Sequence, residues 1–179
     1  MSERIIEIPD GVDLKLEGRE LVVKSGSNEL RRRFYNYHVK MEIKDGKVLI
    51  KTEEERRKVK AVLGTWNAHV NNMINGVTKG YEAKLKIVYS HFPIKFVVKG
   101  EIVVISNFLG EKKPRTSYII PGTEVKMDKD EVVVKGIDKE KVGQTAANIE
   151  TTCKIKELDR RVFQDGCFIT QKPTIIESN

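Results

Sequence analysis

The amino-acid sequence contains an internal repeat, and this repeat limits the possible folds more than any other feature of the chain. Residues 14–24 form two runs of alternating apolar and polar residues around Gly18, and residues 96–105 do the same around Gly100. Two such runs on either side of a glycine turn indicate a β-hairpin. Because the second pattern follows the first at an offset of roughly 81 to 82 residues, the sequence predicts two copies of one domain.

A second hairpin follows the first in each copy. Residues 43–51 alternate on both sides of Asp45 and Gly46, and residues 125–135 form the corresponding pattern in the second copy. An Asp-Gly pair between two alternating segments is the strongest short signal for a hairpin turn. Each copy is therefore expected to contain several antiparallel strands.

Each of these second hairpins is followed by a segment with helical periodicity. In the first copy, Thr52 and Glu55 have the spacing of a capping box, and Gly76 or Gly80 would end the helix. In the second copy, Asp138 is a suitable N-cap. Apolar residues recur in steps of three or four and predict one buried stripe on each helix. The stripes are Val59, Val62, Leu63, Trp66, Val70, Met73 and Val77 in the first helix, and Val142, Ala146, Ile149 and Cys153 in the second.

These elements predict an α+β fold with two tandem repeated domains, each a small antiparallel sheet with one long helix packed on a face. A strand is expected from Tyr81 to Tyr89, and it corresponds to the short apolar run at residues 5–8. The boundary is placed near Gly80, just before that strand. The prediction is an N-terminal repeat of residues 1–80 and a C-terminal repeat of residues 81–179.

The charge of the chain favours a polyanion as a partner. The sequence has 33 basic and 26 acidic residues, and its formal net charge is +7. Neutralisation of phosphates drives the binding of basic proteins to nucleic acids. From composition alone, a basic protein without such a partner is an equally good interpretation. A surface rich in both Lys and Glu is also typical of thermophilic proteins, but that does not explain an excess of one sign.

Neither a metal site nor a membrane segment is expected. The two cysteines, Cys153 and Cys167, form no C-x-x-C motif, so neither a zinc site nor a redox motif is indicated. Cys153 belongs to the apolar stripe of the second helix and is predicted to be a buried core residue. Apolar runs such as residues 95–98 are too short to span a bilayer. We therefore expect a soluble protein from a reducing, cytoplasmic compartment.

The sequence contains no motif for catalysis or for a cofactor. The phosphate-binding motif G-x-x-x-x-G-K-[ST], the dinucleotide motif G-x-G-x-x-G and the nucleophile motif G-x-S-x-G are all absent. His38, His69 and His91 are scattered and have neither metal-ligand spacing nor a nucleophile beside them. The protein is therefore predicted not to be an enzyme, with no cofactor and no small-molecule substrate.

Basic residues gather in three clusters that could bind a polyanion. The first is Arg31, Arg32 and Arg33, which precede an aromatic segment at residues 34–38. Basic side chains next to aromatic rings suit phosphate contact and base stacking. A strand with exposed arginines and an inward-facing Phe34 explains the same residues equally well.

The second cluster is the predicted loop at residues 107–116. Loops on a rigid sheet are a frequent place for function. Phe108 and Leu109 stand at the expected tip, which is unusual for a loop that is only solvated. Lys112, Lys113 and Arg115 supply its positive charge, and we therefore favour an RNA contact for this loop.

The third cluster lies at residues 154–168. Lys154 and Lys156 follow the second helix, where cations also complement the helix dipole. That local role does not explain Arg160 and Arg161, and Arg is well suited to bidentate phosphate recognition. A weaker candidate surface is the polar side of the first helix, whose uncharged or nearly uncharged residues are poor helix formers. It includes Thr65, His69 and Asn72.

Several stretches together resemble the archaeal and eukaryotic branch of the sixth large-subunit ribosomal protein family. The resemblance covers nearly the whole chain, and the order and spacing of the stretches carry it. One departure is the segment Cys167–Thr170, where a different sequence is typical of the family. The stretches are Asn107–Lys112 with Arg115, Val132–Asp138, Asp159–Gly166, Trp66-Asn67 and Met73–Lys86.

This resemblance implies a structural constituent of the large ribosomal subunit, located in the cytoplasm. It would bind large-subunit rRNA near the GTPase-associated stalk base and the sarcin–ricin region, with the C-terminal repeat as the main rRNA-binding domain. Neighbouring ribosomal proteins of the stalk base would be further partners, and the protein would be a monomer outside the ribosome. A free-standing RNA-binding or RNA-chaperone protein is the alternative. By position, the family's contact residues correspond to Asn107, Phe108, Leu109, Gly110, Lys112, Arg115, Arg160, Arg161 and Phe163.

Overall fold

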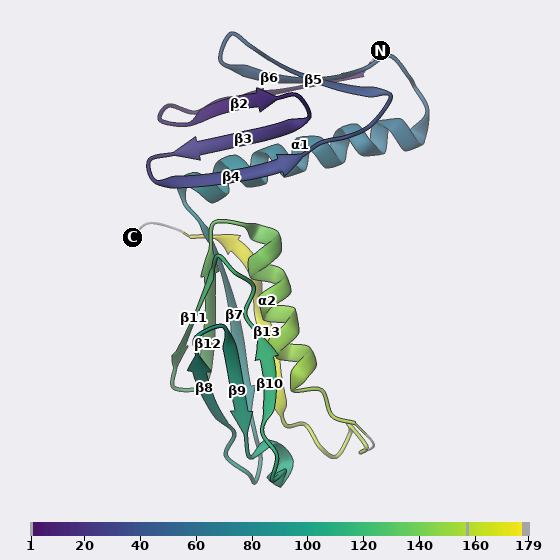
Figure 1. Ribbon diagram of the computed structural model, residues 1–179. Helices are drawn as coiled ribbons and strands as arrows, with labels where there is room; N and C mark the ends of the chain where they lie inside the picture. Colours follow the sequence, from purple (N-terminus) through teal and green to yellow (C-terminus); the bar gives the residue numbers. More distant parts are fainter. Residues whose placement is uncertain (1, 157, 177–179) are drawn as a thin grey trace. The chain divides into compact units, whose positions relative to one another are not determined.

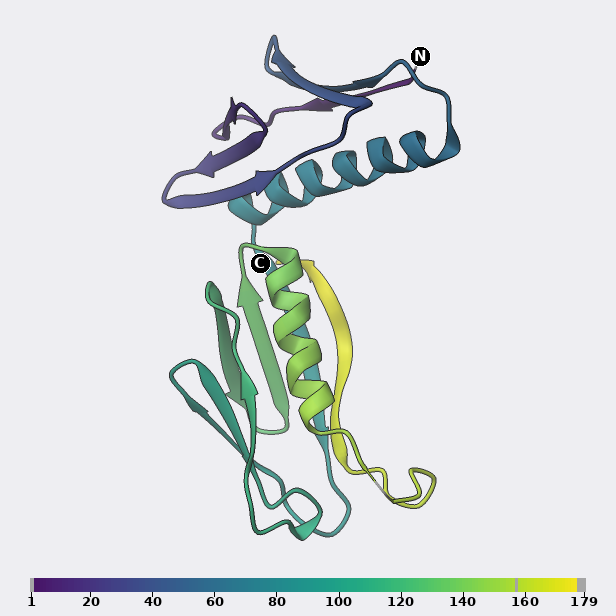
Figure 2. The same ribbon diagram turned by 45° about the vertical axis from the view of Figure 1, so that its right-hand side comes forward.

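The computed structural model describes residues 2–156 and 158–176. These residues divide into two compact units, one ending at Lys79 and the other beginning at Gly80. Both units are α+β, and Figure 1 and Figure 2 show that each combines antiparallel strands with one long helix. In the part of the chain that is described, no helix is long and apolar enough to cross a membrane.

The first unit consists of two three-stranded sheets and one helix. Its elements are β1 (Ser2–Glu7), β2 (Asp13–Glu17), β3 (Glu20–Ser25), β4 (Asn28–Arg33), β5 (Val39–Lys44), β6 (Lys47–Thr52) and α1 (Arg57–Thr78). The strand orders are β1-β6-β5 and β2-β3-β4. Both sheets and the buried side of α1 contribute to one apolar core, which contains Val23, Ile50 and Val70.

The second unit also has two sheets and one long helix. Its elements are β7 (Tyr81–Val88), β8 (Lys95–Lys99), β9 (Ile102–Ser106), a 3-10 turn η1 (Phe108–Gly110), β10 (Arg115–Tyr118), β11 (Thr123–Asp128), β12 (Glu131–Gly136), α2 (Lys139–Thr152) and β13 (Gly166–Ile175). The strand orders are β11-β12-β7-β13 and β10-β9-β8. Leu85, Val134 and Ile149 lie at the centre of its core.

The two units share one arrangement of strands, in agreement with the sequence repeat. The order β1-β6-β5 corresponds to β7-β12-β11, and β2-β3-β4 corresponds to β8-β9-β10. The prediction of a single sheet in each repeat was wrong. β3 pairs with β2 on one side and β4 on the other, so this meander forms its own sheet. Each sheet buries one face in the shared core, which a single wide sheet in so small a unit could not do.

β13 has no counterpart in the first unit and was not expected from the sequence. It pairs antiparallel with β7, from Gly166 opposite Val88 to Ile175 opposite Tyr81, with irregular register in between. Pro173 lies within this strand, and a proline in a short run argues against a strand assignment. β7 therefore lies between two strands, whereas β1 pairs with β6 alone among the described residues.

The turns and helix ends follow the sequence signals in most places. Asp45 and Gly46 have φ angles of 50° and 69°, which are the positive values that a tight hairpin turn requires at both central residues. α1 ends at Thr78, and Gly80 takes the left-handed conformation with a φ of 75°. Asp138 caps α2 as predicted, because its side chain accepts a hydrogen bond from the Glu140 amide.

The capping box predicted for the first helix was wrong. Thr52 is the last residue of β6, and its hydroxyl accepts a hydrogen bond from the Glu54 amide at 3.2 Å. α1 begins only at Arg57, and Arg56 at the N-cap makes no side-chain cap hydrogen bond. Thr52 is paired with both Ser2 and Val39, so the chain needs a further turn before the helix can start.

The predicted core residues are buried, with one partial exception. Val62 is half-buried, and the other residues of both helix stripes are buried. Cys153 and Cys167 lie in the core of the second unit, which confirms the prediction for Cys153. The hydrogen bond with the Cys153 thiol, together with burial, raises the pKa of the Cys167 thiol. The Cys167 thiol is therefore a poor nucleophile near neutral pH.

Candidate RNA-binding surface

Two of the predicted basic clusters meet at one end of the second unit. Figure 1 and Figure 2 both show η1 and the loop that precedes β13 at this end. Arg115 joins them, because its Nη1 donates to the carbonyl oxygens of Thr152 at 2.8 Å and of Lys154 at 2.9 Å. Residues 107–115, 154–156 and 158–165 therefore form one surface, which we call the loop surface.

Arg115 has a structural role in this surface. Its Nε and Nη2 donate to the two carboxylate oxygens of Glu111, at 2.9 Å and 2.5 Å. The centre of its guanidinium lies 4.2 Å from the centroid of the Phe108 ring. Most of the five N–H donors of the guanidinium are thus occupied within the protein. Arg115 thus holds the two loops together through contacts within the protein.

Phe108 is also a structural residue. It is 1% exposed and belongs to the core of the second unit, so its ring packs inside the protein. The turn causes this burial. Asn107, Leu109 and Gly110 have positive φ angles of 62°, 50° and 76°, and the chain reverses so that the Phe108 ring faces inward. Left-handed residues other than glycine are uncommon and are found more often at functional sites.

The other residues of the turn differ in exposure. The Asn107 side-chain amide donates to the Pro93 carbonyl at 3.1 Å, which fixes the start of the turn. Leu109 is half-buried against the core, while Gly110 is exposed. A Cβ atom on Gly110 would lie 3.4 Å from the Phe92 ring. The turn therefore exposes mainly its backbone and the residues that follow it.

The Glu111–Arg115 pair is expected to make the stability of the second unit depend on pH. Hydrogen bonds from Arg115 lower the pKa of Glu111 below its ordinary value of 4.5. A carboxyl group with a depressed folded pKa contributes stability that is complete above its unfolded pKa and is lost as pH falls through the folded pKa. Glu111→Gln should therefore be less stable than the wild type near neutral pH. The difference should vanish in acid, as measured by urea unfolding from about pH 6 to about pH 3. A constant difference across this range would contradict the assignment.

Four lysines supply positive charge that is not neutralised within the loop surface. Lys112, Lys113, Lys154 and Lys156 are exposed. Across the described ranges, none of their side chains has an ion pair or a hydrogen bond. Such side chains can neutralise phosphates without first breaking an internal contact.

The two arginines of the third cluster differ in their surroundings. Arg161 is 91% exposed at its side chain, and its Nη2 lies 3.0 Å from Oδ2 of Asp159. Arg160 has no ion pair or hydrogen bond from its side chain within residues 2–156 and 158–176, and it lines a pocket. Phe163, the aromatic residue of the same loop, is 40% exposed and lines that pocket too.

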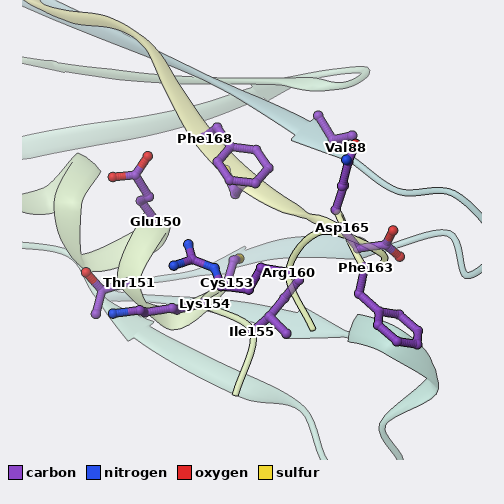
Figure 3. Close-up of a pocket in the computed structure, with 12 residues that line it drawn as sticks. Val88, Glu150, Thr151, Cys153, Lys154, Ile155, Arg160, Phe163, Asp165 and Phe168 are labelled. Carbon is purple, nitrogen blue, oxygen red and sulfur yellow. The ribbon is translucent and has the colours of Figure 1, made fainter. Parts of the chain in front are cut away.

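This pocket has a volume of about 740 Å³ and lies between the end of α2, the loop before β13 and the start of β13. Figure 3 shows Asp165 and Phe163 on the loop side and Glu150 and Lys154 on the helix side. A pocket of this size is within the range of small-ligand sites. Within the described residues, no group of three or more His, Cys, Asp or Glu side chains is placed to hold a metal ion.

Sequence reasoning did not find three of the residues that line this pocket. Asp165 is 4% exposed, and its Oδ1 accepts from the Ser90 amide at 3.1 Å. Glu150 accepts from the Ile169 amide at 2.9 Å through Oε1. Phe168 is 42% exposed. Asp165 and Phe168 lie in the third cluster, but nothing in the sequence places them beside Glu150, because the three residues come together only when β13 pairs with β7.

The first basic cluster lies in the first unit and is partly neutralised. Arg31 pairs with Glu29, and the Arg32 side chain lies 3.2 Å from Nε2 of His69 on α1. Arg33 is exposed. Phe34 is buried, and its ring centre lies 5.2 Å from that of Trp66. The interpretation with an inward-facing Phe34 is thus confirmed.

The aromatic and polar residues near this cluster remain candidates for contact. Tyr35 and Tyr37 are 64% and 86% exposed, and the Arg19 guanidinium lies 4.3 Å from the centroid of the Tyr35 ring. On α1, Thr65 is exposed and its hydroxyl donates to the Ala61 carbonyl, while Asn72 is half-buried. Exposed aromatic rings beside arginine suit base stacking.

Comparisons with known proteins agree with the repeat and with the fold. The family model described as Ribosomal protein L6 matches residues 8–80 and 92–166, one segment in each unit. The large ribosomal subunit protein uL6 of Methanosarcina mazei is 47% identical over 169 residues, which cover 94% of this chain and 96% of that protein. The protein of the same name from Methanococcus vannielii is 46% identical over 167 residues, which cover 93% and 92%. These matches extend over both units, and they show that the chain belongs to the ribosomal protein L6 family, whose members are structural components of the ribosome and not enzymes.

Proposed function

We propose that this protein is a structural constituent of the large ribosomal subunit in the cytoplasm and binds large-subunit rRNA mainly through the loop surface of its second unit. Relatives that share nearly half of its residues are named as large-subunit proteins. The observation that carries the proposal is the contact of Arg115 with Thr152 and Lys154, which holds two lysine-bearing loops together.

This arrangement suits binding to a phosphate backbone. The lysines of the loop surface have no internal partners among the described residues, while Arg115 and Glu111 neutralise each other beneath them. Loops that are already held in place lose less conformational entropy when they bind. Most of the electrostatic attraction between the loop surface and RNA is therefore available for binding, because little of it is offset by the entropy cost of ordering the loops.

The family resemblance supports a position near the stalk base and the sarcin–ricin region, beside other ribosomal proteins. Directed hydroxyl-radical probing tests this position. Iron–EDTA attached to Lys113→Cys should cleave rRNA in these regions of reconstituted large subunits, with Lys58→Cys on α1 as the matched label in the first unit. The native thiols are buried, so only the introduced cysteine should react. Cleavage from the Lys113→Cys label only at distant rRNA segments would contradict the proposed position.

The lysines of the 107–116 loop are expected to contact phosphates. Lys112→Ala with Lys113→Ala should weaken binding to large-subunit rRNA and reduce the slope of log affinity against log salt by about two. The matched control is Lys58→Ala with Lys60→Ala, two exposed lysines on α1 of the first unit. An unchanged slope in the Lys112 and Lys113 variant would show that these lysines do not contact phosphates.

Sedimentation separates the ribosomal role from a free-standing RNA-binding role. In a sucrose gradient of cell lysate, the protein should migrate with the large subunit and stay there after a high-salt wash. Outside the ribosome we expect a monomer. Recovery in the soluble fractions at both salt concentrations would overturn the ribosomal proposal and favour an RNA-binding or RNA-chaperone protein.

A further inference from the structure

Asp165 is a buried carboxylate with unused hydrogen-bonding capacity. It is 4% exposed, and the Ser90 amide is the one hydrogen-bond donor to its side chain among the described residues. An ionised carboxylate can accept about four hydrogen bonds, so Asp165 keeps acceptor capacity beyond the bond from Ser90. Asp165 also lines the pocket beside α2. A ligand with N–H donors would therefore find an acceptor at this wall.

Arg160 lines the same pocket and, in contrast to Asp165, needs hydrogen-bond acceptors. Figure 3 shows its side chain extending across the pocket toward the C-terminal end of α2, near Glu150 and Lys154. No carboxylate or carbonyl oxygen of the described chain accepts a hydrogen bond from it. A guanidinium can donate to a phosphate or to a base acceptor, and it can also stack on a planar ring.

Two aromatic rings complete the pocket. Phe163 and Phe168 are 40% and 42% exposed, although rings of this size bury much apolar surface when they are covered. The floor between them includes the apolar residues Cys153, Ile155 and Cys167. The pocket thus combines flat apolar faces, a donor and an acceptor.

We propose that this pocket holds one unpaired nucleobase of the bound rRNA and that the base carries an exocyclic amino group. The amino group donates to Asp165, the ring packs against phenylalanine, and Arg160 donates to the phosphate or to an acceptor of the same nucleotide. This inference rests on the proposed binding to rRNA. Unpaired bases are commonly recognised by stacking on aromatic rings or arginine planes and by hydrogen bonds to their edges.

Other occupants fit the chemistry less well. A phosphate alone would be repelled by Asp165 and Glu150 and would leave both rings uncovered. A basic protein side chain would suit the carboxylates but would meet Arg160 and the exposed Lys154 and Lys156. Uracil offers a carboxylate only its ring N3–H, whereas an exocyclic amino group offers two N–H donors, so uracil is the weaker match.

Chemical probing of the rRNA complex tests the proposal. Dimethyl sulfate reports unpaired adenine and cytosine, kethoxal reports guanine, and a carbodiimide reports uracil. The wild-type protein should protect one adenine, cytosine or guanine. Asp165→Asn keeps an acceptor for Ser90 but replaces the other oxygen with an amino donor. It should abolish that protection and lower affinity about tenfold, while the hydroxyl-radical footprint on the backbone stays.

Asp128→Asn is the matched control, because it makes the same chemical change at an exposed residue of the second unit that lies outside the loop surface and does not line the pocket. It should keep the base protected. If Asp165→Asn fails to fold, Phe168→Leu and Arg160→Ala provide the test. Phe168 is 42% exposed, and the Arg160 side chain makes no hydrogen bond or ion pair within the described residues, so neither substitution should unfold the unit. A backbone footprint without any base whose protection depends on these residues would overturn the pocket proposal alone. Protection of a uracil would also overturn it, and the absence of any footprint would overturn the proposed function as well.

Discussion

Replacing Phe108 with alanine should lower the free energy of unfolding of the second unit by about 3–5 kcal/mol, the usual loss for a buried phenylalanine. The ring is 1% exposed and lies under the Arg115 guanidinium. Its removal leaves a cavity and deprives Arg115 of its packing surface. The chain has one tryptophan, Trp66, which lies in the first unit. Tryptophan fluorescence would therefore report on the first unit. The stability of the second unit should instead be measured by hydrogen exchange of the amides in β7, β9 and β12.

Leu109→Ala is the matched comparison for Phe108→Ala. Leu109 is the next residue of the same turn but is only half-buried, so the substitution should cost less than about 2 kcal/mol. Compared at equal concentrations of folded protein, Phe108→Ala should bind rRNA almost as the wild type does. A loss of rRNA affinity with unchanged exchange rates would mean that Phe108 contacts RNA directly, which contradicts the structural role.

Ending the chain after Asp165 is expected to unfold the second unit in the absence of denaturant. The truncation removes β13, a strand of ten residues that pairs along the whole of β7. It also removes the buried Cys167 and the amide of Ile169 that donates to Glu150. Each lost ladder hydrogen bond contributes about 1 kcal/mol, and several of them approach the total stability of about 5–15 kcal/mol of a small domain.

The first unit should remain folded in this truncated chain, because its elements all precede Lys79. Trp66 fluorescence should give the same urea midpoint as in the intact protein. Limited trypsin digestion should remove the second unit and leave a fragment that ends near Lys79. Slow hydrogen exchange in β7 and β12 of the truncated chain would show that β13 is not needed and would contradict this prediction.

Local patterns predicted the elements of the fold but not the way in which the strands combine. The Asp45-Gly46 turn, the Asp138 cap and the apolar stripes depend on residues close together in the sequence, and the structure contains all of them. The separate meander sheets and β13 depend on pairings between distant residues. No short pattern records such pairings, and Pro173 lies within β13, where a proline argues against a strand.

In the candidate site, too, the sequence revealed local features but not contacts between distant residues. Lys112, Lys113 and the arginines were found because charge is visible in a sequence. The inward position of Phe108 was not visible, because it follows from the left-handed conformation of Asn107 and Leu109. Arg115 was likewise assigned to RNA because the carbonyl groups that it binds belong to a segment far along the chain.

The pairing of β7 with β13 also has a consequence for the synthesis of the chain. β7 is the first strand of the second unit to leave the translating ribosome, and β13 is the last. The first unit can complete its fold while translation continues, but the second edge of β7 stays uncovered until β13 has been made. Long-range pairings of this kind slow folding. During that delay the open edge of β7 could pair with other chains. Newly made copies of this protein are therefore most vulnerable to aggregation between the synthesis of β7 and the synthesis of β13.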